Sequence, residues 1–399
     1  MSANNKGQNV ANAPLLRFPE FDGKWSMSSL GECCGDFEYG MNAPAKKFDG
    51  INKYIRITDI DDETNRYDDN NPVSPDGNLD NKYIVKKNDI LFARTGASTG
   101  KTYLYNPNDG KLYFAGFLIR ANVKDCNDAR FVFQLTQTSK FKKWINVVSM
   151  RSGQPGINSQ EYASFSFEKP QIQEQKKIAD FLTLLDKRIE IQRSAIEKLK
   201  SLMAEITNRI FSNNHNAKYR VRDFLEEFSE KTTLNNQHEV LSSTTKGLFS
   251  QKEYFNQEVA SEDNTGYKIL RKGQIVLSPQ NLYMGNINYN DNFPIGIVSP
   301  SYKTFEINSS FNKTYIAYMM KTHRALYMYM SVSEQGASVV RRNLNMDDFL
   351  DLQFEIHRTD LQDKIAYQLQ SIANKITLEE KILQGYVSQK NGLLSKMFI

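Results

Sequence analysis

Apolar residues recur at alternating steps of four and three along two separate stretches of the chain, residues 173–211 and 360–398. A period of 3.5 residues is typical of a coiled-coil seam, because the seam then returns to the same helix face every seven residues. The pattern therefore predicts two long helices, and the alternative is two unrelated amphipathic helices on globular cores. The first half of each predicted seam consists of Ile178, Leu182, Leu185, Ile189 and Gln192, and of Ile365, Leu369, Ile372, Ile376 and Glu379.

The two helical stretches align with each other without a gap at an offset of 187 residues, which indicates an internal duplication. The residues that they share include Gln175 and Gln362, Lys177 and Lys364, and Phe211 and Phe398. The alignment extends upstream, because an apolar residue followed by asparagine stands at 157–158 and again at 344–345. Near the start of each half, the expected correspondence pairs Trp25 with Tyr219 and Leu30 with Phe224.

The order of segments is therefore globular, helix, globular, helix, and each globular part is long enough to bury its own core. Runs rich in aromatic and β-branched residues, such as 112–119 and 303–307, predict sheets in both parts. We expect an α+β fold with two similar domains joined by two long antiparallel coiled-coil helices. The second helix leaves its domain at the point equivalent to the first, which predicts an internal pseudo-two-fold axis.

One polar residue interrupts the middle of each predicted seam, Gln192 in the first and Glu379 in the second. An antiparallel pair centred on the predicted axis would bring these two side chains near each other. Polar seam residues fix the register of a coiled coil at some cost in stability, so we expect this role here. The alternative is that both positions are solvated on a wet seam.

Basic residues mixed with amides, hydroxyls and glycines cluster at matching places in both halves, although the net charge is only +5. Such loops can contact DNA phosphates, and Arg, Gln and Asn can also read base edges in the major groove. Solvated turns are the alternative for any single loop, but recurrence in two copies favours DNA binding. The predicted contacts are Arg94, Ser98, Lys101, Arg151 and Gln154 in the first half, and Gln280, Asn281, Tyr283, Ser338, Arg341 and Arg342 in the second.

Catalytic and metal-binding patterns are incomplete in this sequence. The string TGASTGKT at 95–102 resembles a phosphate-binding loop but has three residues between its glycines where the motif needs four. The three cysteines and four histidines have no metal-ligand spacing. No apolar run of 18 residues and no signal-peptide core are present, so we expect a cytoplasmic protein.

Three strings carry a family resemblance: DILFARTGASTGKTY at 89–103, RSGQPGIN at 151–158 and EKPQIQEQKKIADFLTLLDKRIE at 168–190. Together they resemble the specificity subunit of a type I restriction-modification system, and the resemblance covers nearly the whole chain. The second half departs from the family pattern, because Ile356-His357 replaces the proline and SPQNLYMGN replaces the Arg-Thr-Gly loop.

The resemblance implies a target-recognition domain at 1–169, a central conserved helical region at 170–212, a second recognition domain at 213–356 and a C-terminal conserved helical region at 357–399. It implies a non-catalytic subunit that reads bipartite double-stranded DNA. It also implies two methylation subunits and two restriction subunits as partners, with S-adenosylmethionine, ATP and Mg²⁺ on those partners and no cofactor or metal in this chain. Two alternatives stay open: a coiled-coil scaffold that binds only protein, and a self-sufficient modification enzyme.

Overall fold

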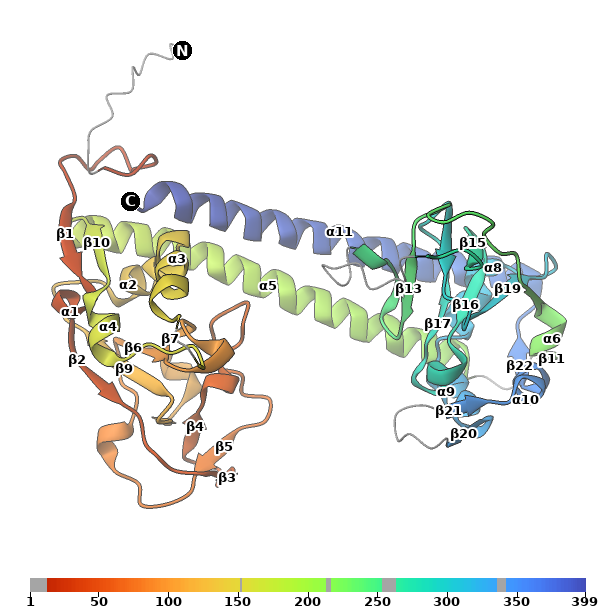
Figure 1. Ribbon diagram of the computed structural model, residues 1–399, viewed down its shortest axis with the longest axis horizontal. Helices are drawn as coiled ribbons and strands as arrows, with labels where there is room; N and C mark the ends of the chain where they lie inside the picture. Colours follow the sequence, from red (N-terminus) through yellow and green to blue (C-terminus); the bar gives the residue numbers. More distant parts are fainter. Residues whose placement is uncertain (1–12, 151–152, 213–216, 253–262, 336–341) are drawn as a thin grey trace, which may run out of the picture. The chain divides into compact units, whose positions relative to one another are not determined.

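The structure is a computed structural model, and it describes residues 13–150, 153–212, 217–252, 263–335 and 342–399 (Figure 1). Its contacts divide the chain into unit 1, residues 1–192 with 382–399, and unit 2, residues 193–381. The two predicted helices are confirmed as α5 (Ile172–Ile210) and α11 (Thr359–Met397), each of 39 residues. Each unit therefore contains one end of each long helix, and the expected α+β fold class is confirmed.

Unit 1 is built on a four-stranded antiparallel sheet in the order β2-β9-β6-β7. These strands are β2 (Cys34–Tyr39), β9 (Leu118–Val123), β6 (Asp89–Ala93) and β7 (Thr102–Leu104). Every residue of β6 is buried, as expected for a central strand with apolar side chains on both faces. One face packs on α2 (Ala129–Leu135) and α3 (Ser139–Val148), and the other on a cluster from β4 (Lys53–Ile55) and β8 (Leu112–Phe114).

Unit 2 repeats the main elements of unit 1 in the same order along the chain. Its four-stranded sheet has the order β12-β19-β16-β17, with β12 (Leu225–Phe228), β19 (Lys303–Ile307), β16 (Ile275–Leu277) and β17 (Ile287–Tyr289). The helices α8 (Lys313–Met319) and α9 (His323–Ser331) follow β19 as α2 and α3 follow β9. A short helix and a strand then lead into each long helix: α4 (Ser159–Ser164) and β10 (Ser166–Lys169), or α10 (Met346–Asp351) and β22 (Gln353–Ile356).

The start of each repeat corrects both predicted correspondences. The strand β1 (Ser26–Ser29) pairs with β10 so that Ser26 faces Lys169, and β11 (Ala217–Arg220) pairs with β22 so that Ala217 faces Ile356. Because Lys169 and Ile356 correspond, Ser26 corresponds to Ala217, and the buried Leu30 corresponds to Val221. The predicted pairings of Trp25 with Tyr219 and of Leu30 with Phe224 are therefore each wrong by three residues, because matching aromatic side chains did not reveal the strand register.

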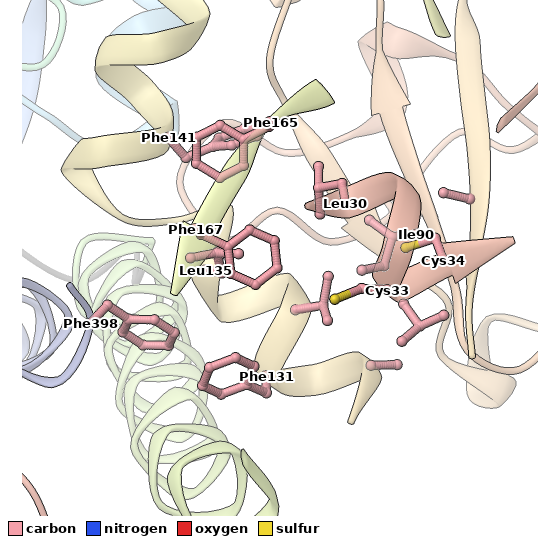
Figure 2. Packing of buried hydrophobic residues seen from close by; sticks show 14 of the residues in the cluster. Leu30, Cys33, Cys34, Ile90, Phe131, Leu135, Phe141, Phe165, Phe167 and Phe398 are labelled. Carbon is pink, nitrogen blue, oxygen red and sulfur yellow. The ribbon is translucent and has the colours of Figure 1, made fainter. Parts of the chain in front are cut away.

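Phenylalanines at the ends of the long helices complete the two cores. In unit 1, the Phe398 ring stacks on Phe131 with centroids 5.1 Å apart (Figure 2). It also meets Trp25 edge-on at 6.5 Å. In unit 2, the Phe211 ring lies 5.0 Å from the Tyr315 ring. The end of α11 thus belongs to the core of unit 1 and the end of α5 to the core of unit 2, which ties both repeats to both helices.

A buried glutamine in the first turn of each long helix makes the same pair of bonds in both units. Gln175 accepts a bond from the Asp128 amide (3.1 Å) and donates to the Pro170 carbonyl (2.9 Å). Gln362 accepts from the Asn312 amide (2.9 Å) and donates to the His357 carbonyl (2.8 Å). Asp128 and Asn312 are themselves the N-cap residues of α2 and α8. We call this arrangement the glutamine clip, and it fixes each long helix to its domain.

The seams are buried or half-buried and the helices run antiparallel inside each unit. In unit 1, Ile178, Leu182 and Ile189 are buried, and Leu185 is half-buried; in unit 2, Leu369 and Ile376 are buried, and Ile365 and Ile372 are half-buried. Across the seam of unit 1, the Lys390 ammonium lies 2.6 Å from the Asp186 carboxylate, and the Arg188 guanidinium lies 4.5 Å from the centre of the Tyr386 ring. The expected proximity of Gln192 and Glu379 joins residues of different units and stays a prediction.

Candidate nucleic-acid interface

Two loops of unit 1 that are distant in sequence lie against each other. The first follows β6 and begins at Arg94, and the second precedes α4. A backbone bridge joins Thr95 to Gly156, the Gly96 amide donates to the Pro155 carbonyl (2.9 Å), and the Ile157 amide donates to the Arg94 carbonyl (3.0 Å). The structure thus brings Arg94, Ser98 and Gln154 into one region, with Gln154 exposed and the other two half-exposed.

The glycines in the first loop serve chain geometry. Gly96 and Gly100 have φ angles of 68° and 91°, in the left-handed region that favours glycine. A Cβ at Gly100 would also lie 2.6 Å from Cγ2 of Ile145, a contact too short to be accommodated without movement. The loop leads from β6 into β7 rather than into a helix, so it lacks the strand-loop-helix order of a nucleotide-binding loop.

Arg94 is held in place by an aromatic ring. Its guanidinium carbon lies 4.9 Å from the centre of the Tyr39 ring, and Nη1 donates to the Gly116 carbonyl (3.3 Å). The Tyr39 hydroxyl accepts a bond from the Ser159 amide (3.2 Å), and hydrogen bonding with Ser159 lowers the pKa of Tyr39. Stacking leaves the in-plane N–H donors of an arginine available for a ligand, so this geometry preorganises Arg94 for planar recognition.

Lys101 has a different environment from the one that the sequence suggested. Its ammonium lies 2.5 Å from the Asp62 carboxylate and 3.4 Å from the Ile60 carbonyl oxygen. The lysine therefore closes the loop of residues 94–101 onto a neighbouring loop of the same unit. Arg151 lies outside the described residues.

Unit 2 places its own loops at the equivalent points of the repeat. The 3₁₀ helix η5 (Pro279–Met284) follows β16, and the hairpin of β20 (Ser333–Gln335) and β21 (Arg342–Leu344) precedes α10. The Arg342 guanidinium carbon lies 4.8 Å from the centre of the Tyr283 ring, and Nη1 donates to the Ser333 carbonyl (3.4 Å). Gln280 is exposed and Asn281 half-exposed on the same turn, whereas Ser338 and Arg341 lie outside the described residues.

Buried polar side chains next to η5 form a hydrogen-bonded network. The Asn286 amide donates to the Asn281 carbonyl (3.2 Å), and its side chain bonds to both the hydroxyl (2.7 Å) and the carbonyl (3.0 Å) of Ser243. Asn288 adds a bond to the Ser243 hydroxyl (2.8 Å). Satisfied buried networks of this kind rigidify the backbone around them. Asn286 therefore positions the turn from inside, while the exposed residues of η5 face solvent.

The sequence did not reveal Tyr39, which lies far upstream of Arg94 on β2. An exposed tyrosine at the end of a strand has no distinguishing local pattern. The sequence prediction named both Tyr283 and Arg342 but did not pair them, and it named no ring as a partner for Arg94. In each unit, one Arg–Tyr stack joins the segment beyond the β6 or β16 strand to another part of the same unit.

Two solved structures with a similar fold come from type I restriction-modification systems. The type I restriction-modification S subunit from M. genitalium is similar over 97% of this chain and 99% of its own, with a TM-score of 0.58 and 16% identity. A chain from a structure on complex assembly and conformational transition of the type I R-M system is similar over 94% of this chain and 97% of its own, with a TM-score of 0.55 and 14% identity. Residues 23–201 also match the model of the type I restriction modification DNA specificity domain. Residues 23–201 are therefore similar to a type I DNA specificity domain, and the whole chain shares the fold of type I S subunits.

Within the described part of the chain, no group of three or more His, Cys, Asp or Glu side chains could hold a metal ion. Over the same residues, no helix is long and apolar enough to cross a membrane. The matched residues 23–201 include both loops of unit 1 and most of α5.

Proposed function

We propose that this chain is a specificity subunit that reads a bipartite DNA sequence, with the loops of unit 1 on one half-site and those of unit 2 on the other. The observation that supports this most strongly is that each unit has an Arg–Tyr stack beside an amide-bearing loop, with the arginine after β6 in unit 1 and on β21 in unit 2. The proposed domains are recognition domains at 1–169 and 213–356 and helical regions at 170–212 and 357–399.

In this proposal, the hydrogen-bonding groups of each side chain determine which base it contacts. Arg94 and Arg342 present planar donors that fit the two acceptors of guanine in the major groove. Gln154, Gln280 and Asn281 present an amide, which fits adenine. Lysines and the remaining arginines hold phosphates, which positions the subunit without selecting a sequence.

The chemistry belongs to other subunits in this proposal. Two methylation subunits bind this chain and carry S-adenosylmethionine, and two restriction subunits with ATP and Mg²⁺ complete the complex. The described surface has large apolar residues that such partners could cover, because Leu184 is 65% and Ile191 is 69% exposed on α5 in unit 1. This chain holds the DNA and the partners but performs no reaction.

The first test is to co-express the chain with its methylation subunit in a methylation-free host and to map N6-methyladenine across the genome. The proposal predicts a split motif with an unread gap of constant length. A continuous motif, or methylation that depends on no sequence, would contradict it and favour a protein-only scaffold.

A pair of matched variants assigns each half of the motif to a unit. Arg94→Ala should relax or abolish recognition in one half only, and Arg342→Ala should do so in the other half only. Losing a base contact costs about 1–3 kcal/mol of discrimination at one position. If both variants altered the same half, the assignment of one half-site to each unit would be wrong.

A further inference from the structure

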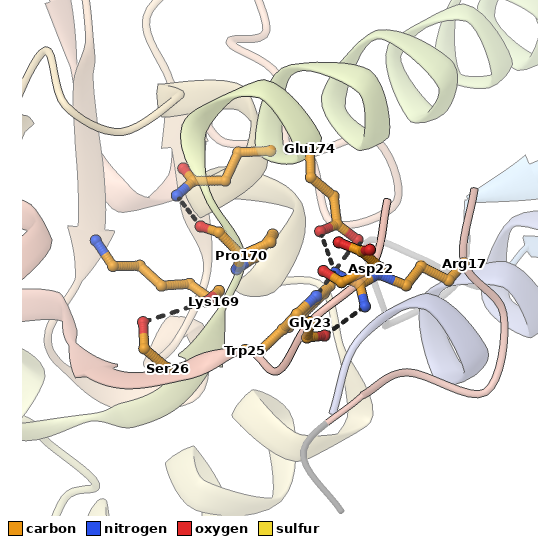
Figure 3. Close-up of polar contacts among 9 residues, drawn as sticks. Arg17, Asp22, Gly23, Trp25, Ser26, Lys169, Pro170 and Glu174 are labelled. Atoms are coloured by element: carbon orange, nitrogen blue, oxygen red, sulfur yellow. Dashed lines mark hydrogen bonds and ion pairs between the residues drawn. The ribbon is translucent and has the colours of Figure 1, made fainter. Parts of the chain in front are cut away.

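The first turn of α5 in unit 1 is covered by the segment that precedes β1. The Arg17 guanidinium donates to both carboxylate oxygens of Glu174 (2.7 Å each) and to the carbonyls of Asp22 (2.8 Å) and Gly23 (2.6 Å) (Figure 3). The Trp25 indole also donates to Glu174 (3.3 Å), which leaves this carboxylate almost fully buried. The segment is thereby fixed across the start of the helix.

The same segment covers the second turn of α5 through an aromatic and an acidic side chain. The Phe18 ring meets the Phe181 ring edge-on with centroids 5.8 Å apart. The Lys177 ammonium lies 5.5 Å from the centre of the Phe18 ring and 3.2 Å from the Glu20 carboxylate. One lysine of α5 therefore holds both Phe18 and Glu20 of a turn that the Phe21 amide closes by donating to the Phe18 carbonyl (3.1 Å).

The first turn of α11 in unit 2 lines an open cleft of about 870 Å³ instead. Its lining includes Lys218, Phe311, Arg358 and Leu361. Leu361 stands where Glu174 stands in the other repeat, so the cleft lacks the carboxylate that binds Arg17.

Free cations surround this cleft, whereas its carboxylates are engaged. Lys364, the counterpart of Lys177, is exposed, and neither it nor Lys218 has an ion-pair partner within the described residues. In contrast, Asp363 accepts a bond from the Asn312 side chain (2.8 Å), and Asp223 accepts one from the Arg220 amide (2.6 Å). Because these donors are neutral, both carboxylates keep their charge, but of these four charged side chains only the two lysines have no partner within the described residues.

We propose that this cleft and the adjoining turn of α11 bind a short turn-forming segment of a partner protein that carries an aromatic and an acidic side chain. The pattern is the one that Phe18 and Glu20 show on α5. Lys364 occupies the position of Lys177 and binds the aromatic and the acidic side chain of the segment. The Tyr367 ring, which is 75% exposed, is available to stack on the aromatic side chain. Because Leu361 replaces Glu174, the segment carries no counterpart of Arg17. This docking site is separate from DNA recognition and does not depend on it.

The test uses a fluorescein-labelled peptide of residues 18–22, Phe-Pro-Glu-Phe-Asp, titrated with the full chain and followed by fluorescence anisotropy. We expect saturable binding that Lys364→Glu weakens at least about tenfold, because a charge-assisted contact is replaced by repulsion. Lys364→Gln should weaken it less and keeps the helix intact. The matched control Lys177→Glu lies on α5 and should leave the affinity unchanged.

Two outcomes would overturn the proposal. The first is no saturable binding, or the same affinity in Lys364→Glu and the unaltered chain. The second is loss of binding in Lys177→Glu, which would place the peptide on α5. A peptide with Gln and Asn in place of its two acids should bind at least about tenfold more weakly. Unchanged circular dichroism of each variant ensures that folding is not the cause, and the methylation motif reports DNA recognition separately.

Discussion

At the scale of single residues, Tyr39 illustrates how a side chain without a role of its own in recognition can position one that has it. Its ring supports the Arg94 guanidinium, and its hydroxyl is bound by the Ser159 amide. Tyr39→Leu should therefore weaken binding to the cognate duplex about fivefold, corresponding to about 1 kcal/mol for a stacked cation. Tyr39→Phe keeps the ring and should stay close to the unaltered chain. Titration of both variants with cognate and unrelated duplexes checks this, and equal losses on the two duplexes would contradict it.

Lys101 provides a residue-scale contrast with Arg94. Because its ammonium is bound to Asp62, Lys101→Met should leave the recognised sequence unchanged. Asp62 is largely exposed, so the loss of the ion pair should lower the free energy of unfolding by less than about 1 kcal/mol. The methylation motif and a thermal melt of the variant test the two statements. A changed motif would show that Lys101 contacts DNA despite its pairing.

The three cysteines should differ sharply in reactivity. Cys33 and Cys34 are buried, and burial raises the pKa of the Cys34 thiol to about 12, whereas Cys126 is exposed. Thiolate is the reactive form, so a thiol reagent at pH 8 should label one cysteine per chain rapidly and the other two only after unfolding. Mass spectrometry of the labelled peptides should find Cys126. Rapid labelling of Cys34 in the folded chain would contradict its burial.

At the scale of elements, the glutamine clip joins each long helix to its domain. Gln175→Leu would leave the Asp128 amide and the Pro170 carbonyl without their partners, and Gln362→Leu would do the same in unit 2. Each change should lower stability by about 1–3 kcal/mol, the usual effect of leaving buried polar groups unsatisfied. Chemical denaturation followed by circular dichroism measures this. Glutamine to glutamate at the exposed Gln368 is a control expected to have little effect.

The seam of unit 1 contains a polar contact that the sequence did not predict. Asp186 accepts a bond from the buried Gln134 side chain (2.6 Å) and pairs with Lys390, which occupies a seam position. Lys390→Leu should lower the free energy of unfolding by about 1–2 kcal/mol, because Asp186 loses its countercharge. Adding Asp186→Asn should recover much of this loss, since it removes the unpaired charge and keeps an acceptor for Gln134. A double variant as unstable as the sum of both single ones would show that the pair does not act as a unit.

At the scale of the whole molecule, the sequence predicted the duplication and both long helices because their signal is periodic and extends over many turns. The strand register at the start of each repeat was not predictable in this way. A strand of four residues has too little pattern to fix its partner, and the buried Leu30 and Val221 are chemically unremarkable. The composition of the loops proposed for DNA binding was visible in the sequence, but the ring that holds Arg94 and the acid that holds Lys101 come from distant parts of the chain.

The glutamine clip also bears on how the two repeats could diverge. The two bonds that both glutamines make go to backbone atoms, an amide and a carbonyl, and Gln175 alone adds a longer bond to the Asn127 side chain (3.4 Å). The shared bonds place no demand on the side chains of their partners. The second copy has His357 in place of Pro170 and Asn312 in place of Asp128, and the glutamine clip is present in both copies. Surface residues of one repeat can therefore change during evolution while the bonds that attach its long helix are conserved between the copies.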